Sequence, residues 1–202
     1  NLFEINGKKD VLICETIGNF LIEEHMLTIV NHAHDTFLTD NPTVIPKSGK
    51  VYGYLCSSPQ QNSEFIANNS SFENINISYF KNLIDDSHKI TKPITANIKN
   101  EEIIRLSDSE ILFDFDFTKK NPEEGKNIIK FNVKKSGILT GIILHFTLNV
   151  DDENIIYSGR QNGSWSDVLK SNTSQFFRKV NENEIITAEF NYYKNDINVF
   201  IK

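Results

Sequence analysis

The second half of this chain carries apolar residues at every other position, which is the pattern of β-strands with one buried and one exposed face. In residues 111–117, three phenylalanines alternate with Asp114 and Asp116. Similar alternation covers residues 128–133, 142–150, 184–193 and 196–201. Turn-forming pairs such as Asn121-Pro122 and Ser158-Gly159 separate these segments. Several antiparallel strands at this spacing predict a sandwich or a barrel.

The first forty residues follow a different pattern. Residues 10–15 form a short apolar run that ends in the carboxylate of Glu15, which predicts a strand buried on both faces. From Glu23 the apolar residues recur with the helical period, and the helix should end before Asp40-Asn41-Pro42, because proline disfavours helix around it. A further strand is expected at residues 51–55. This order of elements predicts an α/β unit, whose ligands lie beyond the carboxyl ends of its strands.

Residues 57–100 are polar, rich in Ser, Asn and Gln, and poorly periodic. A compact domain rarely keeps so long a connection without using it as a lid, an arm or an interface. The apolar residues within it, such as Phe72 and Phe80, would either contact a partner or fold back on their own barrel. Both interpretations are open at this point.

Composition excludes some partners. The chain has 202 residues, of which 39% are hydrophobic, a formal net charge of −6 and a pI of about 5.4. An acidic protein is poorly suited to neutralise phosphates, so we expect no nucleic-acid partner, whereas a cationic ligand would meet a favourable field. No run approaches the roughly 18–20 unbroken apolar residues of a membrane span, so we expect no membrane insertion.

The two cysteines, Cys14 and Cys56, lie in apolar stretches, which predicts two buried free thiols instead of a disulfide. Free thiols suit a reducing compartment, and no signal-peptide pattern opens the chain. We therefore expect a cytoplasmic protein.

Two carboxylates stand out, because Glu15 ends the first strand and Glu24 falls in the first turn of the following helix. Glu23, next to them, is expected to stabilise the helix N-terminus through the macrodipole, by about 0.3–1 kcal/mol. Other acidic groups have structural explanations. Asp114 and Asp116 would share the solvent face of a strand, and residues 151–153 would form a hairpin turn.

The run from Cys14 to Met26 resembles the double-glutamate loop of protein arginine methyltransferases, Ser-Glu-x-x-Gly-Tyr-x-Leu-x-x-Glu-x-Met. The positions in register are Glu15, Gly18, Leu21, Glu24 and Met26. The resemblance continues in residues 33–38, like Ala-Arg-Asp-x-x-Leu, and in residues 44–46, like Ile-x-Pro. Far downstream, Gly163-Ser164-Trp165 is similar to the family's Thr-His-Trp loop.

The resemblance implies roles for these residues. Glu15 and Glu24 would be catalytic, holding the guanidinium of an arginine-containing protein or peptide by charge-assisted bonds, so that its free nitrogen is aimed at a methyl donor. Met26 would limit the room beside the methyl group, and Ser164 and Trp165 would contact the substrate, with Trp165 as a wall of the arginine channel. His25 and Met26 would lie near the cofactor, S-adenosyl-L-methionine. No metal is implied.

The resemblance also implies an organisation, α+β overall. Residues 1–56 would be the C-terminal end of a Rossmann-like methyltransferase domain, residues 57–94 an arm-like insertion, and residues 95–202 a mostly antiparallel β-barrel. In the family such an arm reaches a second subunit, so a homodimer through residues 57–94 is expected for the full-length protein. The family's glycine-rich cofactor loop has no counterpart, since the sequence contains no Gly-x-Gly. We therefore expect most of the cofactor site outside this chain, and this chain to be inactive by itself.

Three departures from the family pattern keep an alternative open. Ser164 stands where the family has histidine, Thr16 where tryptophan is common, and His25 where a small residue is usual. The chain is therefore interpreted either as the substrate-binding C-terminal part of an S-adenosylmethionine-dependent arginine methyltransferase-like protein, or as a non-catalytic methyltransferase-like barrel that serves as a protein-interaction module.

Overall fold

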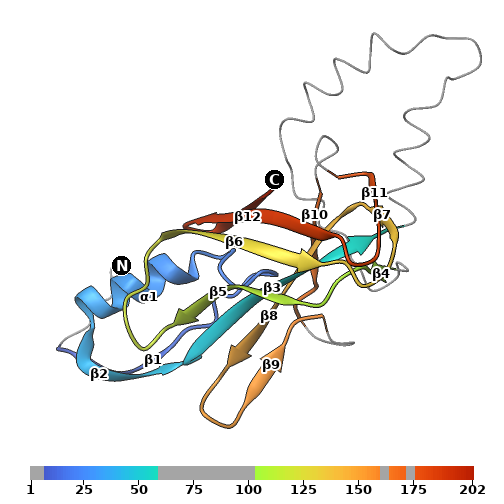
Figure 1. Ribbon diagram of the computed structural model, residues 1–202. Helices are drawn as coiled ribbons and strands as arrows, with labels where there is room; N and C mark the ends of the chain where they lie inside the picture. The colour runs from blue at the N-terminus through green and yellow to red at the C-terminus, as the bar shows by residue number, and fades with distance from the viewer. Residues whose placement is uncertain (1–6, 59–102, 160–163, 172–175) are drawn as a thin grey trace, which may run out of the picture.

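The structure is a computed structural model that describes residues 7–58, 103–159, 164–171 and 176–202. The described residues form one helix and thirteen strands (Figure 1). In chain order these are β1 (Lys9–Ile13), α1 (Met26–Thr36), β2 (Leu38–Ile45), β3 (Ser48–Ser57), β4 (Ile104–Arg105), β5 (Glu110–Asp116), β6 (Glu124–Asn132), β7 (Gly137–Leu139), β8 (Gly141–Asn149), β9 (Ile155–Tyr157), β10 (Val168–Lys170), β11 (Arg178–Val180), β12 (Ile185–Tyr193) and β13 (Asp196–Ile201). From residue 59 onward, the predicted arm lies outside the described residues.

The N-terminal part is a strand–helix–strand unit in which β1 and β2 pair in parallel. The strand predicted at residues 51–55 is present as part of β3, but its place in this unit was wrong, because β3 lies in another sheet and the strand beside β1 is β2, which runs through Pro42. A proline is tolerated at the edge of a sheet, where its missing N–H has no ladder partner to lose. One parallel pair with one helix is less than a doubly wound sheet, so the Rossmann-like assignment stays a prediction.

β1 was predicted to be buried on both faces, and this was wrong for the described residues. Val11 is 54% exposed and Ile13 is 74% exposed. The apolar run alone therefore identified the strand but not its burial, because a continuous run says nothing about which neighbouring segments cover each face.

The helix α1 is shorter than predicted and begins at Met26, after a left-handed His25 with φ of 62°. Its buried face consists of Met26, Leu27, Val30, Asn31 and Ala33. Because no acidic residue lies in its first turn, the predicted macrodipole role of Glu23 is wrong, and Glu24 also precedes the helix.

Two neighbouring antiparallel sheets provide most of the remaining structure. In the larger sheet β3 is flanked by β8 on one edge and by β5 and β4 on the other, and β8 also pairs with β9 and β10. In the smaller sheet β12 lies between β6 and β13. The sheets curl around a common core, so the predicted barrel is seen, among the described residues, as a curled antiparallel half-barrel (Figure 1).

The core forms as the period-two pattern predicts. Phe113, Phe115 and Phe117 are buried, and two of them pack edge-on against Tyr192 of β12 at ring-centroid distances of 4.8 and 5.3 Å. Asp114, on the opposite face of β5, forms an exposed ion pair with Lys50 at 3.1 Å, as expected for a surface position. Cys14 and Cys56 are buried free thiols, which confirms that prediction.

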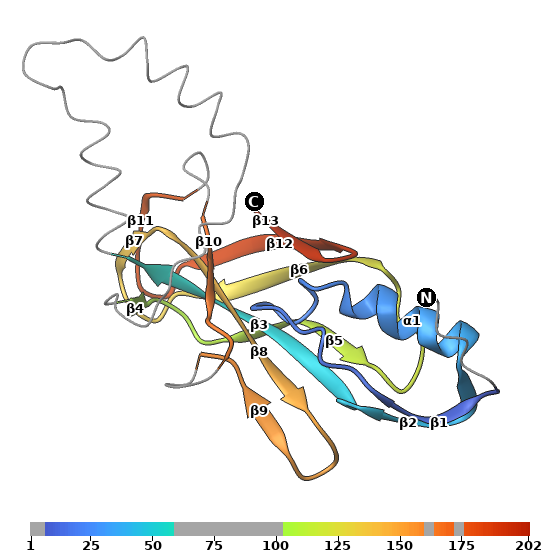
Figure 2. The ribbon, with the colours of Figure 1, turned by 180° about the vertical axis from the view of Figure 1, so that it is seen from behind.

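The helix α1 is attached to the turn that follows β5 (Figure 2). The Nδ2 of Asn31 donates to the carbonyl oxygen of Asn121 at 2.7 Å, and the backbone N–H of Asn121 donates back to Oδ1 of Asn31 at 2.9 Å. A ring nitrogen of His34 lies 2.9 Å from the carbonyl oxygen of Phe117. These contacts fix the strand–helix–strand unit against the half-barrel.

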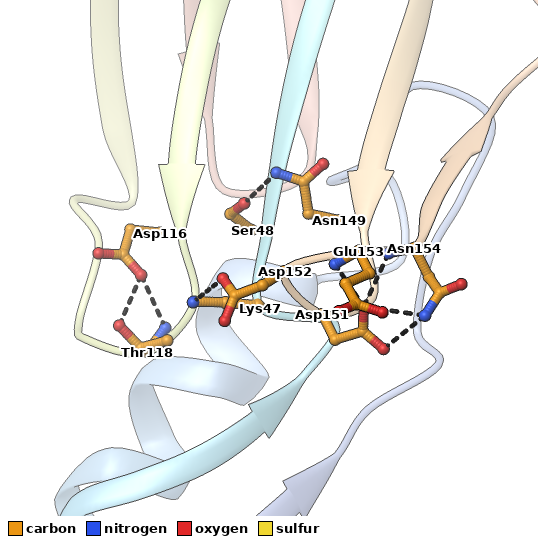
Figure 3. A network of polar contacts seen from close by, with 9 residues as sticks. All are labelled: Lys47, Ser48, Asp116, Thr118, Asn149, Asp151, Asp152, Glu153 and Asn154. Carbon is orange, nitrogen blue, oxygen red and sulfur yellow. Dashed lines mark hydrogen bonds and ion pairs between the residues drawn. The ribbon is translucent and has the colours of Figure 1, made fainter.

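Polar contacts join the strand ends near the β2–β3 connection (Figure 3). Lys47 forms an ion pair with Asp152, and Ser48 accepts a hydrogen bond from Nδ2 of Asn149 at 2.9 Å. Asp151 closes the β8–β9 hairpin by accepting bonds from Asn154, which lowers the pKa of its carboxyl group. The predicted hairpin at residues 151–153 is thus confirmed. Among the described residues, no helix is both long and apolar enough to cross a bilayer.

Candidate functional site

The double-glutamate loop, residues 15–25, is a tight reverse turn between β1 and α1. Gly18 and Leu21 pair in an antiparallel bridge, with the N–H of Leu21 donating to the carbonyl oxygen of Gly18 at 3.1 Å. Asn19 and Phe20 therefore form the tip of the loop, and the legs of the loop run before and after this bridge. Glu15 is on the first leg. Glu24 is on the second, in a further turn that the N–H of His25 closes by donating to the carbonyl oxygen of Ile22 at 3.2 Å.

Glycine is required at position 18 for steric reasons. A Cβ atom there would lie 2.4 Å from Cβ and 2.6 Å from Oε2 of Glu23. That close approach allows Oε2 of Glu23 to accept a hydrogen bond from the backbone N–H of Asn19 at 2.9 Å. Glu23 thus stabilises the loop itself, which is a role that the sequence prediction missed.

Glu15 and Glu24 are both exposed. Within the part of the chain that the structure describes, neither carboxylate takes part in a hydrogen bond or an ion pair. Two unpaired carboxylates on the legs of one turn are free to accept bonds from a cation brought from solution.

Met26 lies beneath the loop and is fully buried. Its Sδ is 3.5 Å from Sγ of Cys14 and 3.6 Å from Oγ1 of Thr16, and these two atoms are 3.2 Å apart. The sulfur atoms of Cys14 and Met26 thus form the floor of the loop. His25 is exposed instead, and its Nε2 lies 3.4 Å from Nδ2 of Asn195, in the β12–β13 turn.

Trp165 joins this loop from a distant part of the sequence. Its Nε1 donates to the carbonyl oxygen of Ile17 at 2.6 Å, across 148 residues. The next residue, Ser166, donates its backbone N–H to Oδ1 of Asn19 at 3.0 Å. The structure therefore brings the predicted tryptophan to the double-glutamate loop, while Ser164 is exposed.

The segment around Trp165 is itself anchored to the end of β9. The N–H of Gly159 donates to the carbonyl oxygen of Trp165 at 3.1 Å, and Gly159 has a φ of 72°, which favours glycine. Ser158 donates to Oδ1 of Asp167 at 3.1 Å, although burial raises the pKa of the Asp167 carboxyl group. Sequence analysis did not single out Asp167, since a lone acid in a turn has no signature.

Two further neighbours of the loop were also missed. Lys170 places its Nζ 4.9 Å from the centroid of the Phe20 ring, and Asn195 contacts His25 as described above. Neither has a recognisable sequence signal, because their contacts depend on how β10 and the β12–β13 turn are placed by the fold. Among the described residues, no group of three His, Cys, Asp or Glu could hold a metal ion.

Comparison with models of protein families finds no match for this chain. Individual proteins do match. Protein arginine N-methyltransferase 1.6 of Arabidopsis thaliana is 26% identical over 158 residues, which are 76% of this chain and 22% of that protein. Protein arginine N-methyltransferase 1 of Saccharomyces cerevisiae is 23% identical over 141 residues, 70% of this chain and 39% of that protein. Protein arginine N-methyltransferase 7 of Oryza sativa subsp. indica is 23% identical over 165 residues, 76% of this chain and 22% of that protein.

This chain is similar in sequence to protein arginine N-methyltransferases. It spans about a fifth to two fifths of the length of these arginine methyltransferases. The relationship therefore supports the resemblance found in the double-glutamate loop, while the activity of a whole arginine methyltransferase concerns much more polypeptide than is present in this chain.

The cofactor that such enzymes imply does not fit the described residues by themselves. Met26 is buried against Cys14 and Thr16, and His25 faces Asn195 at the exposed edge of the loop. Within the described part of the chain, these two residues do not form a cradle for the nucleoside and amino-acid ends of S-adenosylmethionine. The chemistry that this part offers is the binding of a cation by carboxylates.

Proposed function

We propose that this chain is the substrate-binding, C-terminal part of a protein arginine methyltransferase-like protein. In this proposal Glu15 and Glu24 bind the guanidinium group of an arginine in a protein or peptide. The observation that carries it is the docking of Trp165 and Ser166 onto Ile17 and Asn19 of the loop that bears both glutamates.

The chemistry of the guanidinium group supports two carboxylates as its ligands. This group stays protonated and presents five N–H donors in a planar fork, so one carboxylate can bind two of them side by side. Glu15 and Glu24 are exposed, unpaired in the described structure, and lie on opposite legs of one turn. They would hold positive charge toward the nitrogens they bind and orient the remaining nitrogen.

Trp165 supplies an apolar wall for the arginine side chain in the same proposal. Its indole is fixed at one end by the bond to Ile17 and packs edge-on against Phe146 at 5.5 Å. A fixed aromatic surface would position the methylene stem of arginine and favour its cationic head.

The remaining parts of the proposal follow from the resemblance of the sequence to the family and, for the compartment, from the two free thiols. The methyl donor of the full-length protein would be S-adenosylmethionine, and residues 57–94 would be an arm that forms a homodimer. Residues 1–56 would be the end of its Rossmann-like domain, followed by the barrel domain, in a cytoplasmic protein.

Peptide binding tests the proposed site without requiring the cofactor. Isothermal titration of the chain with an arginine-containing peptide is compared with the same peptide carrying citrulline, which has nearly the same shape but no charge. We expect the arginine peptide to bind at least tenfold more tightly. Because charge-assisted hydrogen bonds contribute about 1.5–3 kcal/mol each, Glu15→Gln or Glu24→Gln should weaken its binding about tenfold or more.

Glu182→Gln is the matched control, since Glu182 is also an exposed glutamate but lies in the β11–β12 connection, away from the loop. It should bind as the unchanged chain does. Equal binding of the arginine and citrulline peptides, unaffected by either loop variant, would overturn the proposed site and favour a general protein-interaction module. Methylation of the same peptide by the full-length protein, lost in both loop variants, would test the enzymatic part.

A further inference from the structure

We propose that Lys170 is a positioning residue for the double-glutamate loop, and that its ammonium group connects the loop tip to Asp196. This inference rests on the proposed function, since it assigns the residue that holds the guanidinium-binding loop in place. Lys170 ends β10 and is not among the residues that sequence analysis identified.

The burial of Lys170 calls for an explanation. Its side chain is only 7% exposed, and burying an ammonium group is costly unless it is paired. Its Nζ donates to Oδ1 of Asp196 at 3.1 Å and lies 4.9 Å from the centroid of the Phe20 ring. The carboxylate satisfies the charge, and the ring face contributes a cation–π interaction.

The partner carboxylate is held independently of Lys170. Oδ1 of Asp196 also accepts the backbone N–H of Ile197 at 2.8 Å, and Oδ2 lies 3.4 Å from Nδ2 of Asn198. The side chain of Asp196, the first residue of β13, is 50% exposed, so it reaches from the surface toward the buried ammonium group. Lys170 therefore links Asp196, whose side chain is held in place, to the ring of Phe20.

Phe20 is the loop residue that the Lys170 ammonium group contacts, so a change at Lys170 should act on the loop through Phe20. It is 4% exposed and lies between Glu15 and Glu24 at the tip of the turn. The other tip residue, Asn19, is bound by Ser166, from the same segment that leads into β10. One segment, residues 165–170, thus holds both tip residues, and a shift of the tip would move the two legs that carry the glutamates.

Three variants test this arrangement. Lys170→Met keeps the length of the side chain and removes its charge, Asp196→Asn removes the carboxylate, and Lys170→Arg keeps a cation for both partners. Hydrogen exchange is measured at the loop amides whose bonds the structure defines, those of Asn19, Leu21 and His25. Affinity for the arginine peptide is measured by titration, with the citrulline peptide as reference.

We expect Lys170→Met to speed exchange of these loop amides and to weaken arginine-peptide binding, each about tenfold, while amides of β12 keep their protection. Asp196→Asn should increase loop exchange and weaken peptide binding more than Lys170→Met does, because it leaves a buried ammonium group unpaired. The double variant should show the same exchange and affinity as Lys170→Met alone. Lys170→Arg should keep loop exchange and arginine-peptide affinity close to those of the unchanged chain. Lys126→Met is the control, since it breaks an ion pair with Glu189 on β12, outside the loop.

The outcomes separate this inference from the proposed function. Unchanged loop exchange in a folded Lys170→Met or Asp196→Asn variant would overturn the positioning role, and so would failure of Lys170→Arg to restore loop protection. Faster loop exchange in a chain that shows no preference for arginine would support the positioning role and overturn the proposed function. If Lys170→Met does not fold, Asp196→Asn and the double variant decide between these outcomes.

Discussion

The indole N–H of Trp165 donates a 2.6 Å hydrogen bond to the carbonyl oxygen of Ile17, and this bond joins the loop after the first strand to a turn late in the chain. Ile17 is nearly buried, so without this bond its carbonyl oxygen would have no hydrogen-bond donor. The candidate site therefore consists of two segments joined by this bond. Removing the bond should lower the free energy of unfolding, which can be measured without any ligand.

Trp165→Phe removes this hydrogen bond but keeps an aromatic ring against Phe146. We expect a loss of about 1–2 kcal/mol in the free energy of unfolding, because a buried acceptor loses its donor. Urea unfolding must be followed by circular dichroism, since Trp165 is the only tryptophan of the chain. Tyr193→Phe, at a side chain that is 59% exposed, is the control and should change little. Equal stability of both variants would show that the bond contributes nothing.

Gly18→Ala should destabilise the loop by about 1–3 kcal/mol, because the added methyl group would lie 2.4 Å from Cβ of Glu23 and overpack the turn. The bond between Glu23 and the N–H of Asn19 should be lost with it. Thermal unfolding measures the first effect and amide chemical shifts of the loop the second. Gly137→Ala is milder, since its nearest contact is a flexible Leu106 methyl group at 3.0 Å. A larger loss in that control would contradict the steric explanation.

Asn31→Ala should detach α1 from the turn after β5. Both bonds between Asn31 and the backbone of Asn121 disappear, and we expect a loss of about 2 kcal/mol, or about 1 kcal/mol for each bond. Chemical denaturation gives the value. His32→Ala, at an exposed position of the same helix, should cost less than about 0.5 kcal/mol. Comparable losses in the two variants would mean that the contact with Asn121 does not explain the effect, since alanine raises the helix propensity at both positions.

Stability should fall in acid because of His145. Burial, with a smaller effect of the Arg105 guanidinium, lowers the pKa of His145 from 6.5 to about 4. Between these values the unfolded chain binds the proton and the folded chain does not, so stability is lost as the pH falls from about 6.5 toward 4. From pH 7 to pH 5 we expect this residue to account for about 1 kcal/mol, allowing for partial solvation of the ring.

The comparison of His145→Gln with the unchanged protein isolates that contribution. The glutamine side chain offers a polar group to Ser109, which lies 2.8 Å from Nε2 of His145, but it does not titrate. Urea unfolding at pH 7 and pH 5 should therefore show a smaller decrease for the variant. Parallel decreases would mean that other groups cause the acid sensitivity.

The period-two segments could be predicted from the sequence because, along most of their length, one face of the strand meets the core and the other is less buried; the first half of β8, buried on both faces, is an exception. The strands β5, β6, β8, β12 and β13 lie where the alternation placed them. Strand β2 could not be found this way, since its polar residues and Pro42 are tolerated at its position beside β1. The exposure of Ile13 was equally hidden, because it depends on neighbours that a local pattern does not specify.

Some residues of the candidate site could likewise be identified from the sequence, and others could not. Glu15, Glu24 and Trp165 were identified by their resemblance to a family, and the structure brings the loop and the tryptophan together, while their roles stay predictions. Glu23 was misassigned because its sequence position suited a helix start, whereas the helix begins only at Met26. Lys170 could not be identified, since its burial follows from the placement of β10 and not from its neighbours in sequence.

The contacts between residues 165–170 and the loop tip have an evolutionary consequence. A recombination that exchanged the chain after β2 would keep both glutamates but replace the residues that hold Ile17, Asn19 and Phe20. The half-barrel is thus not an interchangeable module, and a foreign half-barrel would need to bring matching contacts for these three positions. Residues far apart in the gene should therefore be inherited as a unit, with substitutions at the loop tip tolerated only alongside compensating changes near Trp165.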